Sequence, residues 1–129
     1  MKLFSLLPLV LAPLFSAAGE VAPQALRSPG AEAVASTSSD VRIDQVLPFD
    51  TDVWTMTLSA GQGHQIIVDG DGSSDLDAYL YDENGNLVAM DEDYTDFCVV
   101  GITPRWTGTF RLHIVNRGAS ANRYVLTLD

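Results

Sequence analysis

The sequence predicts an all-β domain in which two antiparallel sheets pack face to face as a sandwich. Between residues 40 and 129, short alternations of apolar and polar residues follow one another, and none has the period of a helix. Turn-forming residues separate these runs at intervals of roughly 8–12 residues, which is typical of sandwiches. Because each run has one apolar face to bury, a second sheet must cover it, and about eight strands are expected.

The position of each expected strand follows from where the alternation starts and stops. In chain order the strands are 41–46, 53–58 with Trp54, Met56 and Leu58 on one face, 64–69 with Ile66 and Val68 in phase, 77–82 with Ala78 and Leu80, 87–91, 97–103, 109–116 with Phe110, Leu112 and Ile114, and 122–128 with Tyr124, Leu126 and Leu128.

The segments between these strands carry the residues that tight turns need. Asn84-Gly85 is the strongest short-range signal for a hairpin. Residues 60–63 and 104–108 place glycine or proline between two alternating runs, and 117–121 forms another short connection. Connections this short favour antiparallel strands.

The N-terminus is predicted to be an export signal at residues 1–18. A basic start at Lys2 precedes an apolar run at 3–15, and the small residues at 16–18 resemble a signal-peptidase site. A retained membrane anchor is the alternative, but a helix of this run spans roughly 20 Å against about 30 Å of hydrocarbon. Cleavage after Ala18 would remove the only lysine and leave no segment expected to insert into a membrane. The expected location is therefore the periplasm or the medium.

Residues 19–39 are predicted to be a flexible linker. They contain Pro23, Pro29 and several alanines and serines but no aromatic residue. Such a segment has too little apolar surface to order itself. A pro-segment is the alternative interpretation. The folded domain is then expected at residues 40–129.

Charge, cysteine content and motifs exclude several classes of protein. Seven basic residues stand against 17 acidic ones, a net charge of −10, which is opposite to what a nucleic-acid partner requires. Cys98 is the only cysteine, so the chain has no intramolecular disulfide, and Cys98 is expected to be a small buried hydrophobe. The sequence has no Gly-x-Ser-x-Gly and no His-Glu-x-x-His, and a sandwich of about 90 residues offers little room for a substrate cleft. The chain is therefore not expected to be an enzyme.

Several short motifs together resemble the bacterial pre-peptidase C-terminal domain. In chain order they are Asp52-Val53-Trp54, Leu58-Ser59-Ala60-Gly61-Gln62, Asp75-Leu76-Asp77-Ala78-Tyr79-Leu80-Tyr81-Asp82, Asn84-Gly85-Asn86-Leu87-Val88, Thr107-Gly108-Thr109-Phe110-Arg111 and Asn122-Arg123-Tyr124. Their order and spacing carry the resemblance, which covers roughly residues 40–129.

The resemblance implies a jelly-roll-like β-sandwich without catalytic activity. Domains of that family are usually appended to exported enzymes. Some of them bind calcium, and some bind collagen or other extracellular polymers. No attached catalytic domain is expected from the sequence. The surface aromatic residues and N-terminal acidic segment of the collagen-binding members have no match in it, so collagen binding is not expected.

The acidic residues between Asp69 and Asp96 form the main chemical feature of the sequence. Ten acidic residues fall in this stretch, and no lysine or arginine lies between Arg42 and Arg105. A hard cation such as Ca²⁺ would relieve the repulsion and takes its ligands from carboxylates, carbonyls and water. The candidate calcium ligands are Asp69, Asp71, Asp75, Asp77, Asp91 and Asp93. The alternative is that these acids cap turns and keep the domain soluble.

Basic and aromatic residues near the last two strands form a candidate binding face. Its residues are Arg111, His113, Arg117, Arg123, Tyr79, Tyr81 and Trp106. Arg111, His113 and Arg117 share the outward phase of their strand, and the aromatic residues could stack on sugars. The alternative is a solvated face whose aromatic residues pack locally.

Two functions follow from these observations. The first is an exported, non-catalytic module that binds an extracytoplasmic protein or polysaccharide, with acidic loops that bind calcium. The second is a structural or folding accessory to an exported hydrolase, with no ligand of its own.

Overall fold

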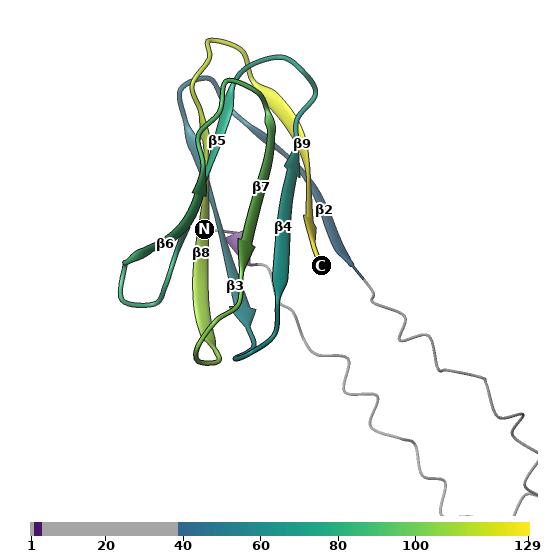
Figure 1. The fold of residues 1–129 in the computed structure, drawn as a ribbon. Coiled ribbons are helices and arrows are strands. Elements are labelled where there is room, and N and C mark those ends of the chain that lie inside the picture. Colours follow the sequence, from purple (N-terminus) through teal and green to yellow (C-terminus); the bar gives the residue numbers. More distant parts are fainter. Residues whose placement is uncertain (1, 4–38) are drawn as a thin grey trace, which may run out of the picture. The chain divides into compact units, whose positions relative to one another are not determined.

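The computed structural model describes residues 2–3 and 39–129. Within them the strands are β1 (Lys2–Leu3), β2 (Asp40–Val46), β3 (Thr51–Leu58), β4 (His64–Asp69), β5 (Leu76–Tyr81), β6 (Leu87–Asp91), β7 (Phe97–Ile102), β8 (Gly108–Asn116) and β9 (Asn122–Leu128). Two sheets result, one of five strands in the order β1-β3-β8-β5-β6 and one of four in the order β2-β9-β4-β7 (Figure 1).

The strand pairing is that of a jelly roll. β2 pairs with β9, β3 with β8, β4 with β7 and β5 with β6, and all four pairs are antiparallel. This nested pattern arises when one long hairpin is rolled into two facing sheets. The predicted fold class is confirmed, and each of the eight predicted strands is found with bounds that differ by at most two residues.

The core lies between the two sheets and follows the predicted alternation. Phe110, Leu112 and Ile114 of β8 face Tyr124 and other residues of the opposite sheet, and all are at most 1% exposed. Fully burying side chains of this size is worth about 1.5–3 kcal/mol each. The shared core explains how a chain without a disulfide holds two sheets together. As predicted, Cys98 is buried in this core.

The edge strand β2 differs from the other strands in which of its residues point inward. In β2 the inward phase is charged, with Asp40, Arg42 and Asp44, while Val41 and Ile43 are 49% and 59% exposed on the outside. Inward charges on an edge strand discourage pairing with other chains. This side of the sandwich is therefore lined by polar groups.

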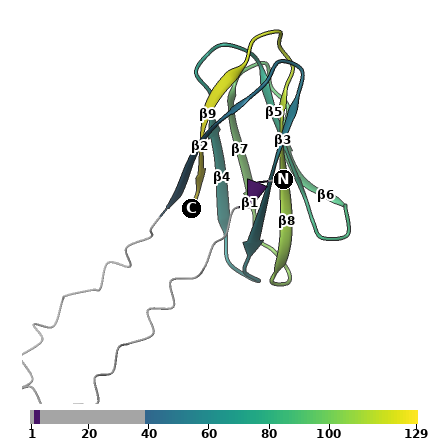
Figure 2. The same ribbon diagram turned by 180° about the vertical axis from the view of Figure 1, so that it is seen from behind.

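β1 was not predicted, because it falls within the segment expected to be the export signal. It pairs in parallel with β3, with Lys2 opposite Trp54 and Leu3 opposite Thr55 (Figure 2). The rest of the predicted leader, 1–18, and of the predicted linker, 19–39, lies outside the described residues, except for Ser39. Neither residues 2–3 nor residues 39–129 include a helix that could cross a bilayer.

Two buried asparagines join the loops at one end of the sandwich. The Asn116 amide donates to the carbonyls of Leu47 and Ser120 at 3.1 and 2.8 Å. The Asn122 amide donates to the Ser74 carbonyl and to Asp96 Oδ2 at 3.1 and 2.9 Å. The loops after β2, β4, β6 and β8 are therefore held together at this end.

Candidate binding site

The outer face of the five-stranded sheet gathers five of the predicted binding residues. β5 and β8 pair with Tyr79 opposite His113 and Tyr81 opposite Arg111. Their neighbours in sequence, among them Leu80 and Leu112, are fully buried, so the alternation turns these four side chains outward. With Arg117, which follows β8, they form what we call the β5–β8 face.

Polar contacts fix the orientation of Tyr79 and Arg117. Arg117 Nε donates to Asp77 Oδ2 at 2.6 Å, and Arg117 Nη2 donates to the Tyr79 hydroxyl at 2.8 Å. The Tyr79 hydroxyl donates to Glu92 Oε1 at 2.5 Å. Burial and this bond to Glu92 raise the pKa of Tyr79 to about 12, so the hydroxyl remains a donor at neutral pH. A network held in this way loses little entropy when a ligand binds.

The rings of Tyr81 and His113 contact one another on the same face. Their centroids lie 4.7 Å apart at an interplanar angle of 54°. Burial, aided by the charge of Arg111, lowers the pKa of His113, so the imidazole is neutral at pH 7. The face therefore presents two phenols, one neutral imidazole and two guanidinium groups.

Arg123 and Trp106, the other two predicted binding residues, lie elsewhere. Arg123 belongs to β9 of the opposite sheet, where it pairs with Gln45. Trp106 lies in the loop between β7 and β8 and stacks on Phe110, with ring centroids 6.4 Å apart. The structure therefore separates them from the β5–β8 face, because proximity in sequence to the last strands does not determine which sheet face a residue occupies.

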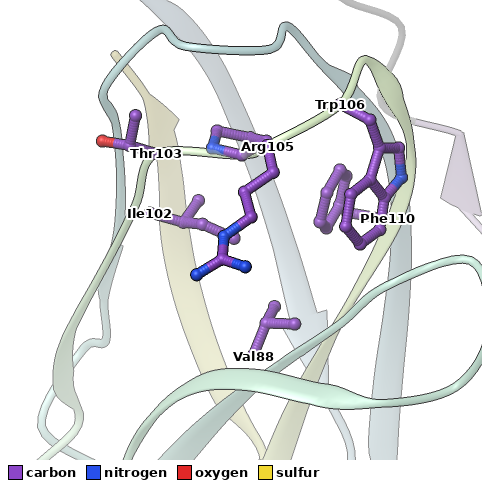
Figure 3. A pocket seen from close by; sticks show the side chains of 7 residues that line it. Val88, Ile102, Thr103, Arg105, Trp106 and Phe110 are labelled. Atoms are coloured by element: carbon purple, nitrogen blue, oxygen red, sulfur yellow. The ribbon is translucent and has the colours of Figure 1, made fainter.

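Trp106 forms one wall of a small pocket of about 290 Å³ (Figure 3). Its lining side chains are Val88, Ile102, Thr103, Pro104, Arg105, Trp106 and Phe110. Figure 3 shows the Arg105 side chain reaching across it toward Val88. A pocket of this size lies at the lower limit for small-molecule sites, so it suits one side chain or one sugar ring.

Val88 lines this pocket because of an irregularity in β6. Ala89 pairs with Leu80 and Leu87 pairs with Tyr81, which leaves Val88 as an extra residue in a β-bulge. Bulges redirect a side chain away from the regular alternation. The neighbour Met90 pairs with Tyr79, so β6 has one residue beside the β5–β8 face and another, Val88, in the lining of the pocket.

The predicted calcium ligands lie in the loops after β4 and β6 and in the adjoining parts of β4, β5 and β6. Asp71 accepts hydrogen bonds from the backbone of Ser73 and Arg123, and Asp93 accepts from the backbone and hydroxyl of Thr95. Asp91 accepts from the Val99 amide at 2.9 Å. Asp69, at the end of β4, is exposed. These contacts match the turn-capping alternative.

Asp75 and Asp77 lie in a more crowded environment. Burial, together with the charges of Asp77, Asp93 and Asp96, raises the pKa of Asp75. Its Oδ1 atom is buried and has no hydrogen-bond partner. Across residues 2–3 and 39–129, no group of three or more histidine, cysteine or acidic side chains is arranged to hold a metal. Calcium binding remains a prediction.

Sequence reasoning missed the residues that organise the end of the sandwich where the loops after β2, β4, β6 and β8 meet. We call this end the loop end. Asn122 is fully buried, and its Oδ1 accepts from the Asp71 amide at 3.1 Å. Asp96 Oδ2 accepts from the Gly72 amide at 2.6 Å. Gly70 leaves room for both side chains, since a Cβ there would lie 2.2 Å from Asp96 Oδ2. The available signal was the pair of asparagines at the end of β8 and the start of β9, Asn116 and Asn122.

No family model and no curated protein matches the chain. Solved structures do. The pre-peptidase C-terminal domain of collagenase from Bacillus anthracis has a TM-score of 0.56 and 17% identity, over 70% of this chain and 89% of that one. Aeromonas hydrophila PliG, a periplasmic lysozyme inhibitor of g-type lysozyme, has a TM-score of 0.53 and 15% identity, over 70% and 84%. The resemblance found in the sequence is thereby confirmed at the level of fold: the domain has the sandwich fold of a pre-peptidase C-terminal domain.

Proposed function

We propose that the chain is an exported, non-catalytic module that binds an extracytoplasmic protein or polysaccharide through the β5–β8 face. The observation that carries the proposal is the pairing of Tyr79 with His113 and of Tyr81 with Arg111 on one outward face. Tyrosine and arginine are enriched at protein interfaces, and tyrosine rings also stack on sugars.

The exported location follows from the predicted leader at residues 1–18. It is consistent with a structural neighbour described as periplasmic. That neighbour inhibits g-type lysozyme, so a sandwich of this fold can serve as a protein-binding module. A sandwich of about 90 residues offers little room for a substrate cleft, which favours binding over catalysis.

Binding to two defined probes tests the proposal. We would measure the dissociation constant of the exported chain for a g-type lysozyme and for soluble chitin oligosaccharides. Tyr81→Ala is expected to weaken binding to the preferred probe by about tenfold or more, because central aromatic anchors dominate such interfaces. Gln65→Ala, an exposed residue of β4, is the matched control and should leave affinity unchanged.

Either probe binding with this sensitivity supports the proposal and identifies the ligand class. If Tyr81→Ala weakened the affinity no more than Gln65→Ala does, the binding surface would lie elsewhere. No binding to either probe would favour the accessory function, in which the module stabilises a partner hydrolase and has no ligand of its own.

We further propose that the loop end binds calcium, with Asp75, Asp77 and Asp93 as the central carboxylates. The unpaired, buried Oδ1 of Asp75 supports this proposal. A buried carboxylate oxygen without a donor is costly unless a cation satisfies it. Burial and, after it, the charges of Asp77, Asp93 and Asp96 raise the pKa of Asp75, so a divalent cation would also neutralise the repulsion among these acids. The bound ion would link the loop after β4 to the loop after β6.

A further inference from the structure

The side of the sandwich between β2 and β3 carries two carboxylates that the proposed function does not use. Asp44 of β2 and Asp52 of β3 face one another across this side, with side chains 35% and 15% exposed. We call this pair of carboxylates, with the β3 edge beside it, the acidic slot. Beneath the two carboxylates lie Trp54 and Tyr124, which are 5% and 0% exposed.

The slot is occupied by an ammonium group. Lys2 Nζ lies 2.6 Å from Asp44 Oδ2 and 2.8 Å from Asp52 Oδ2. It also lies 5.6 Å from the centroid of the Trp54 ring, within the range of a cation–π contact. Burial disfavours the charge of Lys2, but the hydrogen bonds to Asp44 and Asp52 outweigh burial and raise its pKa.

The groups beneath the two carboxylates are organised for a cation. Trp54 Nε1 donates to the Tyr124 hydroxyl at 2.8 Å, and that hydroxyl donates to Asp52 Oδ2 at 2.6 Å. These two hydrogen bonds hold the Asp52 carboxylate in place. Since both donors are neutral groups, the negative charge of Asp52 is left for a cation to balance. Such preorganised, partly desolvated carboxylates bind an ammonium more strongly than exposed ones do.

The backbone carrying Lys2 is also bound. β1 adds to the edge of β3 as a parallel strand, with Lys2 opposite Trp54 and Leu3 opposite Thr55. Adding a strand to a sheet edge is a general mode of peptide recognition, in which the backbone supplies affinity and side-chain pockets supply specificity. The acidic slot and the β3 edge therefore bind an extended backbone and a lysine side chain at the same time.

Lys2 is the only lysine of the chain and lies within the predicted leader, so cleavage after Ala18 would remove it. A second processed copy would carry no lysine either. We propose that the acidic slot of the processed protein is a docking site for an extended, lysine-bearing segment of a partner protein. In this structure the chain's own Lys2–Leu3 takes the place of that segment.

A peptide titration tests this site independently of the β5–β8 face. The chain beginning at residue 19 is suitable, because every core residue lies between Val46 and Leu128. We would titrate it with an acetylated peptide of residues 1–6 and with the same peptide carrying norleucine at the lysine position. The lysine peptide should bind, and norleucine should weaken binding by about tenfold or more. The indole N–H resonance of Trp54 should shift during the titration, and that of Trp106 should not.

Variants of the protein locate the contact. Asp44→Asn and Asp52→Asn should each weaken the lysine peptide by about tenfold, and raised salt should weaken it further. Asn at position 52 still accepts from Tyr124, and a thermal melt checks that each variant folds. Glu83→Gln, an exposed residue of the turn between β5 and β6, is the charge-matched control. Absence of peptide binding would overturn the proposal. Equal affinity for both peptides would do so too, as would affinity unaffected by the Asp44 and Asp52 variants.

Discussion

At the scale of single residues, side chains that stay buried and polar determine the shape of the loop end. Asn116 is 1% exposed and Asn122 is fully buried, and each bonds to more than one loop. Side-chain amides suit this role because they donate and accept at once. The carboxylates near them keep a fixed arrangement only while these asparagines are present.

Asn122→Ala is expected to destabilise the domain by about 2–4 kcal/mol, because it leaves the Ser74 carbonyl and the Asp71 amide without partners. Urea denaturation measures the change in unfolding free energy. The control is Asn84→Ala, in the exposed turn between β5 and β6, which should change stability by no more than about 0.5 kcal/mol. Equal effects of the two variants would contradict the organising role of Asn122.

Cys98 is expected to be unreactive in the folded protein. Burial, with a smaller contribution from Asp91, raises the pKa of the Cys98 thiol to about 12, and its Sγ donates to the Leu76 carbonyl at 3.0 Å. Since the thiolate is the reactive form, a thiol reagent at about pH 8 should label the protein only after denaturant is added. Rapid labelling of the native protein, followed by absorbance, would show that this side of the core opens.

Asp75→Asn is expected to raise the melting temperature at neutral pH when calcium is absent. The folded-state pKa of Asp75 is raised, so its stabilising protonated form is lost as the pH rises through that pKa. The amide removes this penalty. The difference between variant and wild type should shrink as the pH falls toward the normal range of aspartate, where wild type is protonated too. Melts at a series of pH values would reveal a constant or reversed difference if the argument is wrong.

At the scale of strands and turns, alternation was sufficient to predict eight strands. Most of these strands bury one apolar face, so the period of two is visible in the sequence. β2 was predicted from the same alternation, although its apolar residues Val41 and Ile43 point outward and its inward side is charged. β1 escaped prediction because two residues carry no period. It is specified by its pairing with β3, which a single sequence does not display.

The hairpin between β5 and β6 depends on backbone conformation at one glycine. Gly85 has a φ of 81°, and a Cβ placed there would meet no atom within 4 Å. Gly85→Ala should therefore cost about 1 kcal/mol through backbone strain alone. Gly63→Ala, where φ is negative and the new Cβ lies 3.7 Å from Thr103 Oγ1, is the control and should be nearly neutral. Chemical denaturation of both variants compares them directly.

At the scale of the whole molecule, the sequence predicts which residues share a sheet face better than it predicts how the sheets and loops are arranged. The outward-pointing side chains of β5 and β8 include Tyr79, Tyr81, Arg111 and His113, and the pairing of these two strands brings them together on one face. Alternation predicts this face once the pairing of the strands is known. The separate positions of Arg123 and Trp106 depend on which sheet and which loop each occupies. That information is in the topology, which alternation alone does not give.

Calcium is expected to raise the melting temperature of the domain. A ligand at 100 times its dissociation constant adds about 2.7 kcal/mol, which for so small a domain is a rise of roughly 10–20 °C. Melts in excess EDTA, millimolar Ca²⁺ and millimolar Mg²⁺ measure the effect, and Asp75→Asn should abolish it. Identical melts in EDTA and Ca²⁺ would leave turn capping as the role of these acids.

Chemical-shift mapping by NMR tests the central claim most directly, because it locates the ligand on the molecule. Amide spectra of the labelled domain would be recorded with a g-type lysozyme and with chitin oligosaccharides. We expect the largest changes along β5 and β8, at Tyr79, Tyr81, Arg111, His113 and Arg117. Changes confined to the sheet formed by β2, β9, β4 and β7, or none with either probe, would contradict binding through the β5–β8 face.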